Sequence, residues 1–273
     1  MDQFRPQGFN ILPMVVKNLL IINGMMFLAT LIFESRGVDL TDILGLHFFS
    51  SEKFRPYQLI THMFMHGSFL HIFSNMFALW MFGSMLESVW GPKRFLYFYF
   101  SCGLGGALAH LGVTWWQIHG IQNSISIYQN NPGIPQFATL TEKYDYLLNM
   151  DRVQGFIEFW KKNPGDTGIM QQSVQLAGEI PGLLADIPVV GASGAVFGVL
   201  VAFGVLFPNT YLYLYFFLPV KAKYFVVFYA GFELYAGIIG SQDGIAHFAH
   251  LGGALVGFLM VKYWNRNLRK DFF

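Results

Sequence analysis

Long apolar stretches dominate the chain, and their lengths predict membrane-spanning helices. A helix needs about 20 mostly apolar residues to cross the hydrocarbon layer of a bilayer. Six stretches approach that length, and they run over about 12–33, 59–86, 94–115, 187–207, 224–239 and 245–264. The sequence therefore predicts an all-α polytopic membrane protein in which residues 1–273 form a single domain.

Two polar segments fall between these stretches, on the outer face of the predicted bundle. Residues 34–57 mix polar and aromatic side chains, which is typical of a structure partly embedded at the membrane surface. Residues 117–186 form a connection long enough to carry structure of its own. Within it, apolar residues recur at helical spacing over 141–161 and predict one amphipathic helix on the outer surface.

Basic residues predict the orientation, because short cytoplasmic loops carry an excess of lysine and arginine. Six spans put both termini on one side, and that side receives Arg5, Lys17, Lys93, Arg94, Lys221, Lys223, Lys262, Arg266, Arg269 and Lys270. We therefore expect both termini to be cytoplasmic. No transit-like presequence precedes the first span, which favours a bacterial inner membrane over an organelle.

Composition agrees with a membrane protein. Of the 273 residues, 54% are hydrophobic and only 12% are charged, against about 25% charged in soluble domains. An ordinary soluble enzyme would lack the charged side chains to cover its surface. The net charge of +1 argues against a strongly basic nucleic-acid binder. The single cysteine, Cys102, cannot form an internal disulfide, which excludes a disulfide-stapled secreted fold.

Polar side chains inside predicted spans are costly, and they indicate a functional site. They gather in the second, fourth and sixth spans, as Thr61, His62, His66, His71, Ser74, Asn75, Glu87, Ser193, His247 and His250. Glycines at helical spacing allow the fourth and sixth spans to pack closely. Such packing would bring the imidazole of His250 next to the hydroxyl of Ser193, the minimum for a nucleophile activated by a general base.

We expect no acidic residue in a position to orient His250. Glu87 lies sixteen residues beyond His71, which is about 24 Å along a helix axis. The sequence thus predicts a serine–histidine dyad without an acidic third member.

Four motifs follow one another between about residues 57 and 264. They are His62-Met-Phe-Met-His66-Gly-Ser-Phe-Leu-His71-Ile-Phe-Ser-Asn75, Gly83-x-x-x-Glu87-x-x-x-Gly91, Gly191-Ala-Ser193-Gly194 and Ala249-His250-Leu-Gly-Gly253-x-x-x-Gly257. Together they resemble the rhomboid family of intramembrane serine proteases. The resemblance implies a rhomboid-like bundle of six transmembrane helices.

The resemblance also implies the roles of individual residues. Ser193 would be the nucleophile and His250 the general base. His71 and Asn75 would donate hydrogen bonds to the oxyanion, alongside the backbone N–H of Ser193. The activity implied is cleavage of peptide bonds in the transmembrane segments of membrane proteins, which enter sideways past the fifth span.

Further residues are expected to support this site. His66 would line a water-filled cavity together with His71 and Asn75. Phe197 would stack under His250, at a position where some members of the family have tyrosine. Glu87 would tie the cytoplasmic end of the second span to the following turn. The structural glycines implied by the motifs are Gly83, Gly91, Gly194, Gly253 and Gly257.

The expected partners are the lipid bilayer and single-pass membrane-protein substrates, without nucleic acid, metal or cofactor. His62 and His66 stand four apart and suggest a metal pair, but no third ligand converges on them. Ser193 also fits a small residue in a helix contact, and His71 with Asn75 fits an interhelical clamp.

Two other functions remain open for the whole chain. One is a catalytically silent rhomboid-like protein that binds and escorts membrane proteins. The other is a small transporter, although no internal repeat supports it. The natural substrate, its cleavage-site preference, the oligomeric state, the gating mechanism and the role of residues 117–186 are not encoded in any recognisable pattern.

Overall fold

The computed structural model describes residues 12–214, 217–239 and 246–268, most of them in helices. Arg5, Arg269 and Lys270, which contribute to the predicted orientation, lie outside these ranges. The chain forms two compact units, which are described separately. The first comprises the chain up to Leu46, Arg55–His110 and the chain from Val189, and the second comprises His47–Phe54 and Leu111–Pro188.

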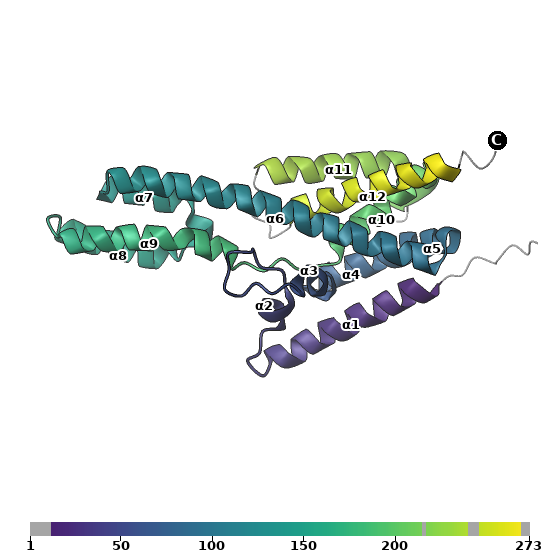
Figure 1. Cartoon of the computed structure of the whole chain (residues 1–273), viewed down its shortest axis with the longest axis horizontal. Helices are drawn as coiled ribbons and strands as arrows, with labels where there is room; N and C mark the ends of the chain where they lie inside the picture. The colour runs from purple at the N-terminus through teal and green to yellow at the C-terminus, as the bar shows by residue number, and fades with distance from the viewer. Residues whose placement is uncertain (1–11, 215–216, 240–245, 269–273) are drawn as a thin grey trace, which may run out of the picture. The chain divides into compact units, whose positions relative to one another are not determined.

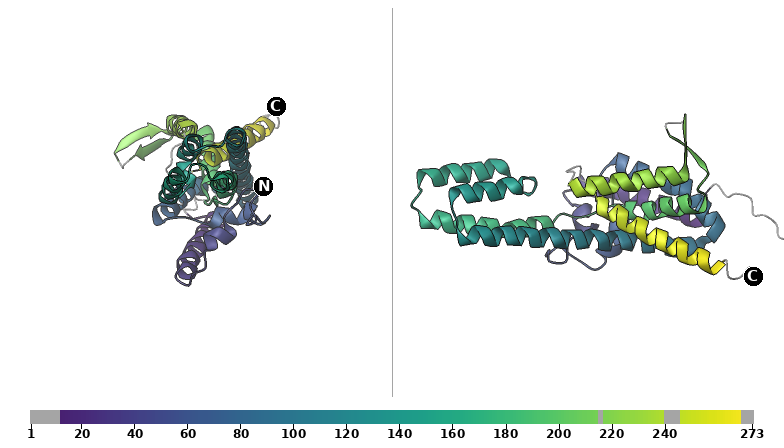
Figure 2. Two further views of the ribbon diagram at one scale, coloured as in Figure 1. Left: turned by 90° about the vertical axis from the view of Figure 1, so that its left-hand side faces the viewer. Right: turned by 90° about the horizontal axis from the view of Figure 1, so that it is seen from above.

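The first unit holds most of the helices (Figure 1). In chain order its elements are α1 (Met14–Glu34), α2 (Leu40–Leu44), α3 (Gln58–Thr61), the 3₁₀ turn η1 (His62–Phe64), α4 (Phe69–Ala78), the π-helical turn η2 (Leu79–Gly83), α5 (Ser84–Trp90), the start of α6 (Pro92–Asn130), α10 (Ser193–Leu206), β1 (Tyr211–Leu214), β2 (Leu218–Lys221), α11 (Ala222–Ile239) and α12 (His247–Leu268). The strands β1 and β2 pair antiparallel in a short hairpin (Figure 2).

Four helical stretches in the described ranges are long and apolar enough to cross a membrane. They are Met14–Glu34, Phe69–Trp90, Pro92–Asn130 and Ala222–Ile239, and the shorter α10 is apolar too. The predicted all-α membrane class is therefore confirmed. The count of six spans and the single-domain description stay predictions.

The predicted start of the second span is wrong by about ten residues. Residues 58–64 fold as the short turns α3 and η1, and the long helix begins only at Phe69. Its start is fixed by Ser68, whose hydroxyl accepts a hydrogen bond from the backbone N–H of His71 at 3.2 Å. A serine at the N-cap satisfies one of the free N–H groups of a first helical turn.

The fourth span also begins later than predicted, at Ser193 instead of residue 187. Val189 pairs with Leu46 in an isolated β-bridge, so this apolar segment is extended. Gly191 follows with a φ of +127°, a value that favours glycine and breaks the helical pattern. Ser193 is therefore the first residue of α10, not a residue six positions inside a span.

The second unit is helical throughout most of its length. It contains the end of α6, α7 (Ile134–Lys143), the turn η3 (Asp145–Leu147), α8 (Met150–Lys162) and α9 (Thr167–Ala185). A separate apolar core, which includes Ile121, Phe137, Trp160 and Ile180, holds these helices together. The single amphipathic helix predicted over 141–161 is wrong: the chain turns after α7, and the side chain of Asn149 caps α8 by accepting from the N–H of Arg152.

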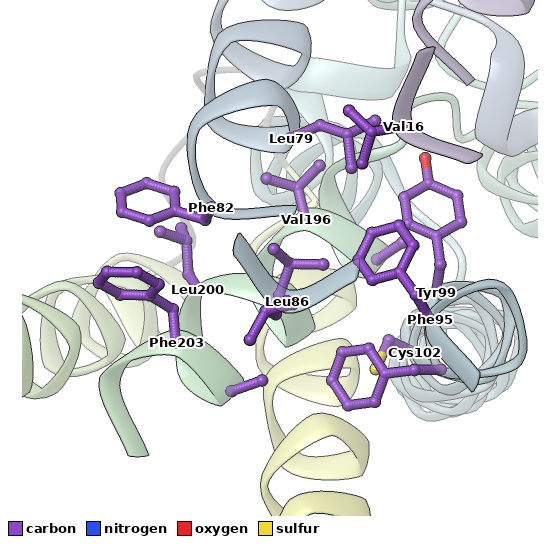
Figure 3. Close-up of a cluster of buried hydrophobic side chains, with 14 of the residues drawn as sticks. Val16, Leu79, Phe82, Leu86, Phe95, Tyr99, Cys102, Val196, Leu200 and Phe203 are labelled. Carbon is purple, nitrogen blue, oxygen red and sulfur yellow. The ribbon is translucent and has the colours of Figure 1, made fainter. Parts of the chain in front are cut away.

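The core of the first unit surrounds α10. Side chains from α1, the second span, α6 and α10 meet there, and those labelled in Figure 3 are Val16, Leu79, Phe82, Leu86, Phe95, Tyr99, Cys102, Val196, Leu200 and Phe203. Ten of the fourteen residues of α10 are buried, as expected for a helix that is apolar on every side. This central helix carries Ser193 at its first position.

Candidate functional site

Ser193 lies at the N-terminus of α10, where the first backbone N–H groups have no partner inside the helix. Gly191, two residues before Ser193, donates its N–H to the carbonyl oxygen of His62 at 2.9 Å, which fixes the approach of the chain to the helix. Ser193 itself is partly exposed, although its neighbours Ala192 and Gly194 are buried. A helix N-terminus with free N–H groups and a positive dipole end favours negative charge beside it.

The backbones of α10 and α12 are in direct contact through glycine. A Cβ added at Gly253 would lie 1.9 Å from the carbonyl oxygen of Gly194, and one at Gly257 would lie 2.8 Å from the Cα of Gly198. Close approach of this kind is what small residues permit between membrane helices. The helices α10 and α12 therefore meet along the glycine faces that the sequence indicates (Figure 1).

His250 lies against the face of α10 that begins with Ser193. Its ring stacks on Phe197, with centroids 4.2 Å apart and planes inclined by 7°. Phe197 stands four residues after Ser193, so the two side chains leave α10 on the same face, one turn apart. His250 is 7% exposed. The contact between α10 and α12 therefore places the imidazole of His250 on the same face of α10 as the hydroxyl of Ser193.

The imidazole of His71 packs directly against Gly191, close to the hydroxyl of Ser193. A Cβ added at Gly191 would lie 2.8 Å from Nε2 of His71 and 3.4 Å from Oγ of Ser193. Only glycine allows this close approach, which places an imidazole nitrogen near both the hydroxyl and the N-terminus of α10. Donors grouped in this way can stabilise negative charge that develops beside them.

Asn75 is buried on α4, and its Nδ2 donates a hydrogen bond to the carbonyl oxygen of His71 at 2.9 Å. A carboxamide nitrogen carries two N–H groups, so one donor remains for another acceptor. The oxyanion role of Asn75 stays a prediction.

His62 and His66 do not share a helix face, because η1 ends at Phe64 and Met65 is extended. Nδ1 of His62 donates to the carbonyl oxygen of Gln58 at 2.8 Å, and burial lowers the pKa of His62 to about 4. His66 packs edge-on against His71, with centroids 5.0 Å apart. Burial, and then the neighbouring His71, lower the pKa of His66 to about 3. Both imidazoles are therefore neutral near pH 7, and their placement does not support a metal pair.

The small cavity beside Ser193 has a different lining from the predicted one. The lining comprises His62, Gly103, Gly106, Ala107, Val189, Val190, Gly191, Ser193, Gly194, Ala246 and Ala249. It includes none of the three residues expected there, His66, His71 and Asn75.

Glu87 has a different partner from the predicted one. Its two carboxylate oxygens accept from the backbone N–H groups of Val15 at 2.9 Å and Val16 at 2.8 Å. These are free donors of the first turn of α1, so Glu87 caps that helix from a distance in sequence. The turn that follows is instead made by Gly91, whose φ of +79° ends α5. Gly83 lies close to the side chains of Leu79 and Phe95, where a Cβ would meet carbon atoms at 3.0 and 3.1 Å.

Sequence reasoning missed an acid next to His250. Glu233 on α11 is 2% exposed, and its Oε2 lies 2.9 Å from Nδ1 of His250 and 2.7 Å from Nδ1 of His247. The expectation that no acid can orient His250 is therefore wrong. The sequence contains a signal for this residue. Glu233 is an acidic residue in the middle of the predicted span 224–239, where a charge is costly and indicates a site.

Comparisons with known proteins point to the rhomboid family. The family model for the rhomboid domain matches residues 53–115 and 166–266. The chain is 28% identical to the RHOMBOID-like protein 12, mitochondrial, of Arabidopsis thaliana over 242 residues, which is 89% of this chain and 56% of that protein. It is 27% identical to the Rhomboid protein 1, mitochondrial, of Saccharomyces cerevisiae over 214 residues, which is 78% of this chain and 43% of that protein.

A third relative, the Rhomboid-like protein 15 of Arabidopsis thaliana, is 30% identical over 106 residues, or 38% of this chain and 26% of that protein. The chain thus spans about half of the length of the first two relatives. Two of the three names are mitochondrial, so the expectation of a bacterial inner membrane finds no support in these comparisons. The membrane location itself agrees with both the comparisons and the apolar helices.

Proposed function

Because the chain belongs to the rhomboid family, whose members are generally intramembrane serine proteases, we propose that it is an endopeptidase that cleaves transmembrane segments. The observation that carries the proposal is the position of Ser193. It begins a buried helix beside the contact of His71 with Gly191, and the ring of His250 stacks one turn along the same face. A hydroxyl, an imidazole and a site for an oxyanion are what acyl transfer requires.

The proposed reaction follows the serine-protease pattern. Oγ of Ser193 attacks the carbonyl carbon of the substrate peptide bond while its proton passes to Nε2 of His250. The carbonyl oxygen becomes negative beside the N-terminus of α10, where Nε2–H of His71 and the first N–H groups of α10 can donate to it. His250 then returns the proton to the leaving amine as the C–N bond breaks. Water, activated by the same imidazole, hydrolyses the acyl-enzyme and regenerates Ser193.

The proposed substrates are single-pass membrane proteins. A peptide bond inside a helix is shielded by its own hydrogen bonds, so a cut requires local unwinding and favours helix-weakening residues at the site. Entry past α11 fits the exposure of that helix. Its apolar residues Val227, Phe228 and Ile238 are each more than 70% exposed, while only Ala222, Glu233 and Ala236 are buried. The proposal includes cytoplasmic termini, with the catalytic serine reached from the opposite face.

The test is labelling of the detergent-solubilised full chain with a fluorophosphonate, together with cleavage of a model single-span substrate. Wild type should label and cleave, and Ser193→Ala and His250→Ala should do neither. The matched control is Ser88→Ala, which removes an exposed hydroxyl that donates to the carbonyl oxygen of Ser84. It should behave like wild type. Labelling that survives Ser193→Ala rejects the assignment, and a wild type without any cleavage favours the catalytically silent escort protein.

A further inference from the structure

The helix α11 carries one acidic residue, and it is buried among residues that are otherwise largely exposed. Glu233 is 2% exposed, whereas its neighbours Phe232, Leu234 and Tyr235 are 52%, 47% and 63% exposed. A carboxylate at this depth in an apolar helix is costly unless it is paired. Its environment therefore has to supply compensating donors, and the identity of those donors indicates what the carboxylate does.

Both donors come from α12. Oε2 of Glu233 lies 2.9 Å from Nδ1 of His250 and 2.7 Å from Nδ1 of His247. A carboxylate only accepts hydrogen bonds, so each Nδ1 donates and carries the proton. In neutral His250 this leaves Nε2 without a proton. That nitrogen is the one able to receive the proton of Ser193.

The second donor holds the carboxylate in place. His247 precedes His250 by three residues, so both imidazoles leave α12 on one face. One carboxylate oxygen has two lone pairs and can accept from both rings. Because His247 and His250 fix the oxygen from two directions, its position relative to the catalytic ring does not depend on the torsions of the glutamate alone. Stacking on Phe197 restrains the same ring from its face.

We propose that Glu233 is a positioning residue for His250, which makes the catalytic group a serine–histidine–glutamate arrangement whose third member comes from α11. The inference rests on the proposed protease function and deepens it. The carboxylate selects the tautomer of His250 and stabilises the imidazolium that forms when Ser193 loses its proton. His247 anchors the carboxylate and does not contact the substrate.

The test compares Glu233→Gln and Glu233→Asp with wild type in steady-state cleavage of the model substrate. Loss of the orienting acid in soluble serine proteases lowers kcat by about 10⁴-fold. We expect Glu233→Gln to lower kcat by about 10²- to 10⁴-fold, with KM within about threefold of wild type. Glu233→Asp keeps the charge but withdraws it by one carbon–carbon bond. Its kcat should therefore lie between that of wild type and that of Glu233→Gln.

The matched control is Glu87→Gln, which removes the other buried carboxylate of the described chain and lies on α5, away from the site. Glu87→Gln should lower the melting temperature and leave kcat and KM unchanged in the folded protein. A Glu233→Gln variant with wild-type kcat, or one that changes KM alone, overturns the proposal. If Glu233→Gln does not fold, a Glu233→Asp variant with wild-type kcat overturns it equally.

Two further arms separate the alternatives. Ser193→Ala is assayed in parallel: if it is inactive while Glu233→Gln is fully active, only the role of Glu233 fails and the protease function stands. Glu233, His247 and His250 also have the composition and spacing of a metal site. Wild-type kcat should therefore be unchanged after treatment with EDTA, and a loss that Zn²⁺ restores would overturn the positioning role in favour of a metal centre.

Discussion

The contact between α10 and α12 offers the sharpest prediction, because single methyl groups can be added at graded distances from a facing backbone. In Gly253→Ala the new Cβ would lie 1.9 Å from the carbonyl oxygen of Gly194, and in Gly257→Ala it would lie 2.8 Å from the Cα of Gly198. Ordinary contact begins at about 3.4 Å, so the helices must separate by about 1.5 Å in the first variant and about 0.6 Å in the second.

The losses of stability and of activity should both be larger for Gly253→Ala than for Gly257→Ala. Overpacking a helix contact costs about 1–3 kcal/mol, and here the obstruction is backbone that cannot rotate away. Part of that cost is offset by the better helix propensity of alanine, about 1 kcal/mol. Because Gly253 lies one turn from His250, the same displacement moves the imidazole relative to Ser193. A misplacement of about 1 Å can lower kcat by about 10²-fold.

The assay is thermal unfolding in detergent together with kcat on the model substrate, at a temperature where every variant is folded. Gly24→Ala on α1 is the control, because a Cβ there meets no atom within 4 Å. We expect Gly24→Ala to match or slightly exceed wild type in melting temperature, Gly257→Ala to lose stability modestly, and Gly253→Ala to lose most stability and about 10²-fold in kcat. A Gly253→Ala variant as stable and active as Gly24→Ala would refute the packing argument.

Three further substitutions test the site and its support. Gly191→Ala places a methyl group 2.8 Å from Nε2 of His71 at a φ of +127°, so kcat should fall at least 10²-fold, and wild-type kcat on the model substrate would contradict an oxyanion site there. Asn75→Ala should lower kcat by about 10- to 10³-fold, and an unchanged kcat removes it from that role. Glu87→Gln leaves a donor of the first turn of α1 unsatisfied, so the free energy of unfolding should fall by about 1–3 kcal/mol. A defect in kcat at unchanged melting temperature would disprove its structural role.

Much of the bundle could be predicted from the sequence, because lipid imposes a simple requirement. A spanning helix needs an apolar run of sufficient length, and every such run is visible in the sequence. The ends of the helices were harder to predict where an apolar segment is not helical. Residues 187–192 are as hydrophobic as a span, yet Val189 is extended beside Leu46. An extended apolar segment and an apolar helix can have the same composition, and only the pairing partner distinguishes them.

The candidate site likewise contains residues that a pattern along one helix indicates and one residue that only the contact between helices brings in. Ser193 and His250 could be proposed from the sequence, and the glycine faces of α10 and α12 could be predicted from spacing, because each set of glycines lies along one helix. The carboxylate of Glu233 could not be assigned to His250 in this way. It comes from a different helix, and no periodicity links α11 to α12. Its partner depends on how those two helices are rotated against each other.

The sequence by itself determined the membrane class, the glycine faces and the choice of Ser193 and His250 as candidates, since each follows from local chemistry along one helix. Tertiary structure alone decided that Ser193 begins its helix, that Glu87 caps α1 and that Glu233 meets His250. These three facts depend on contacts between segments far apart in the chain. Such contacts are fixed by packing of whole helices, which no local pattern of residues records.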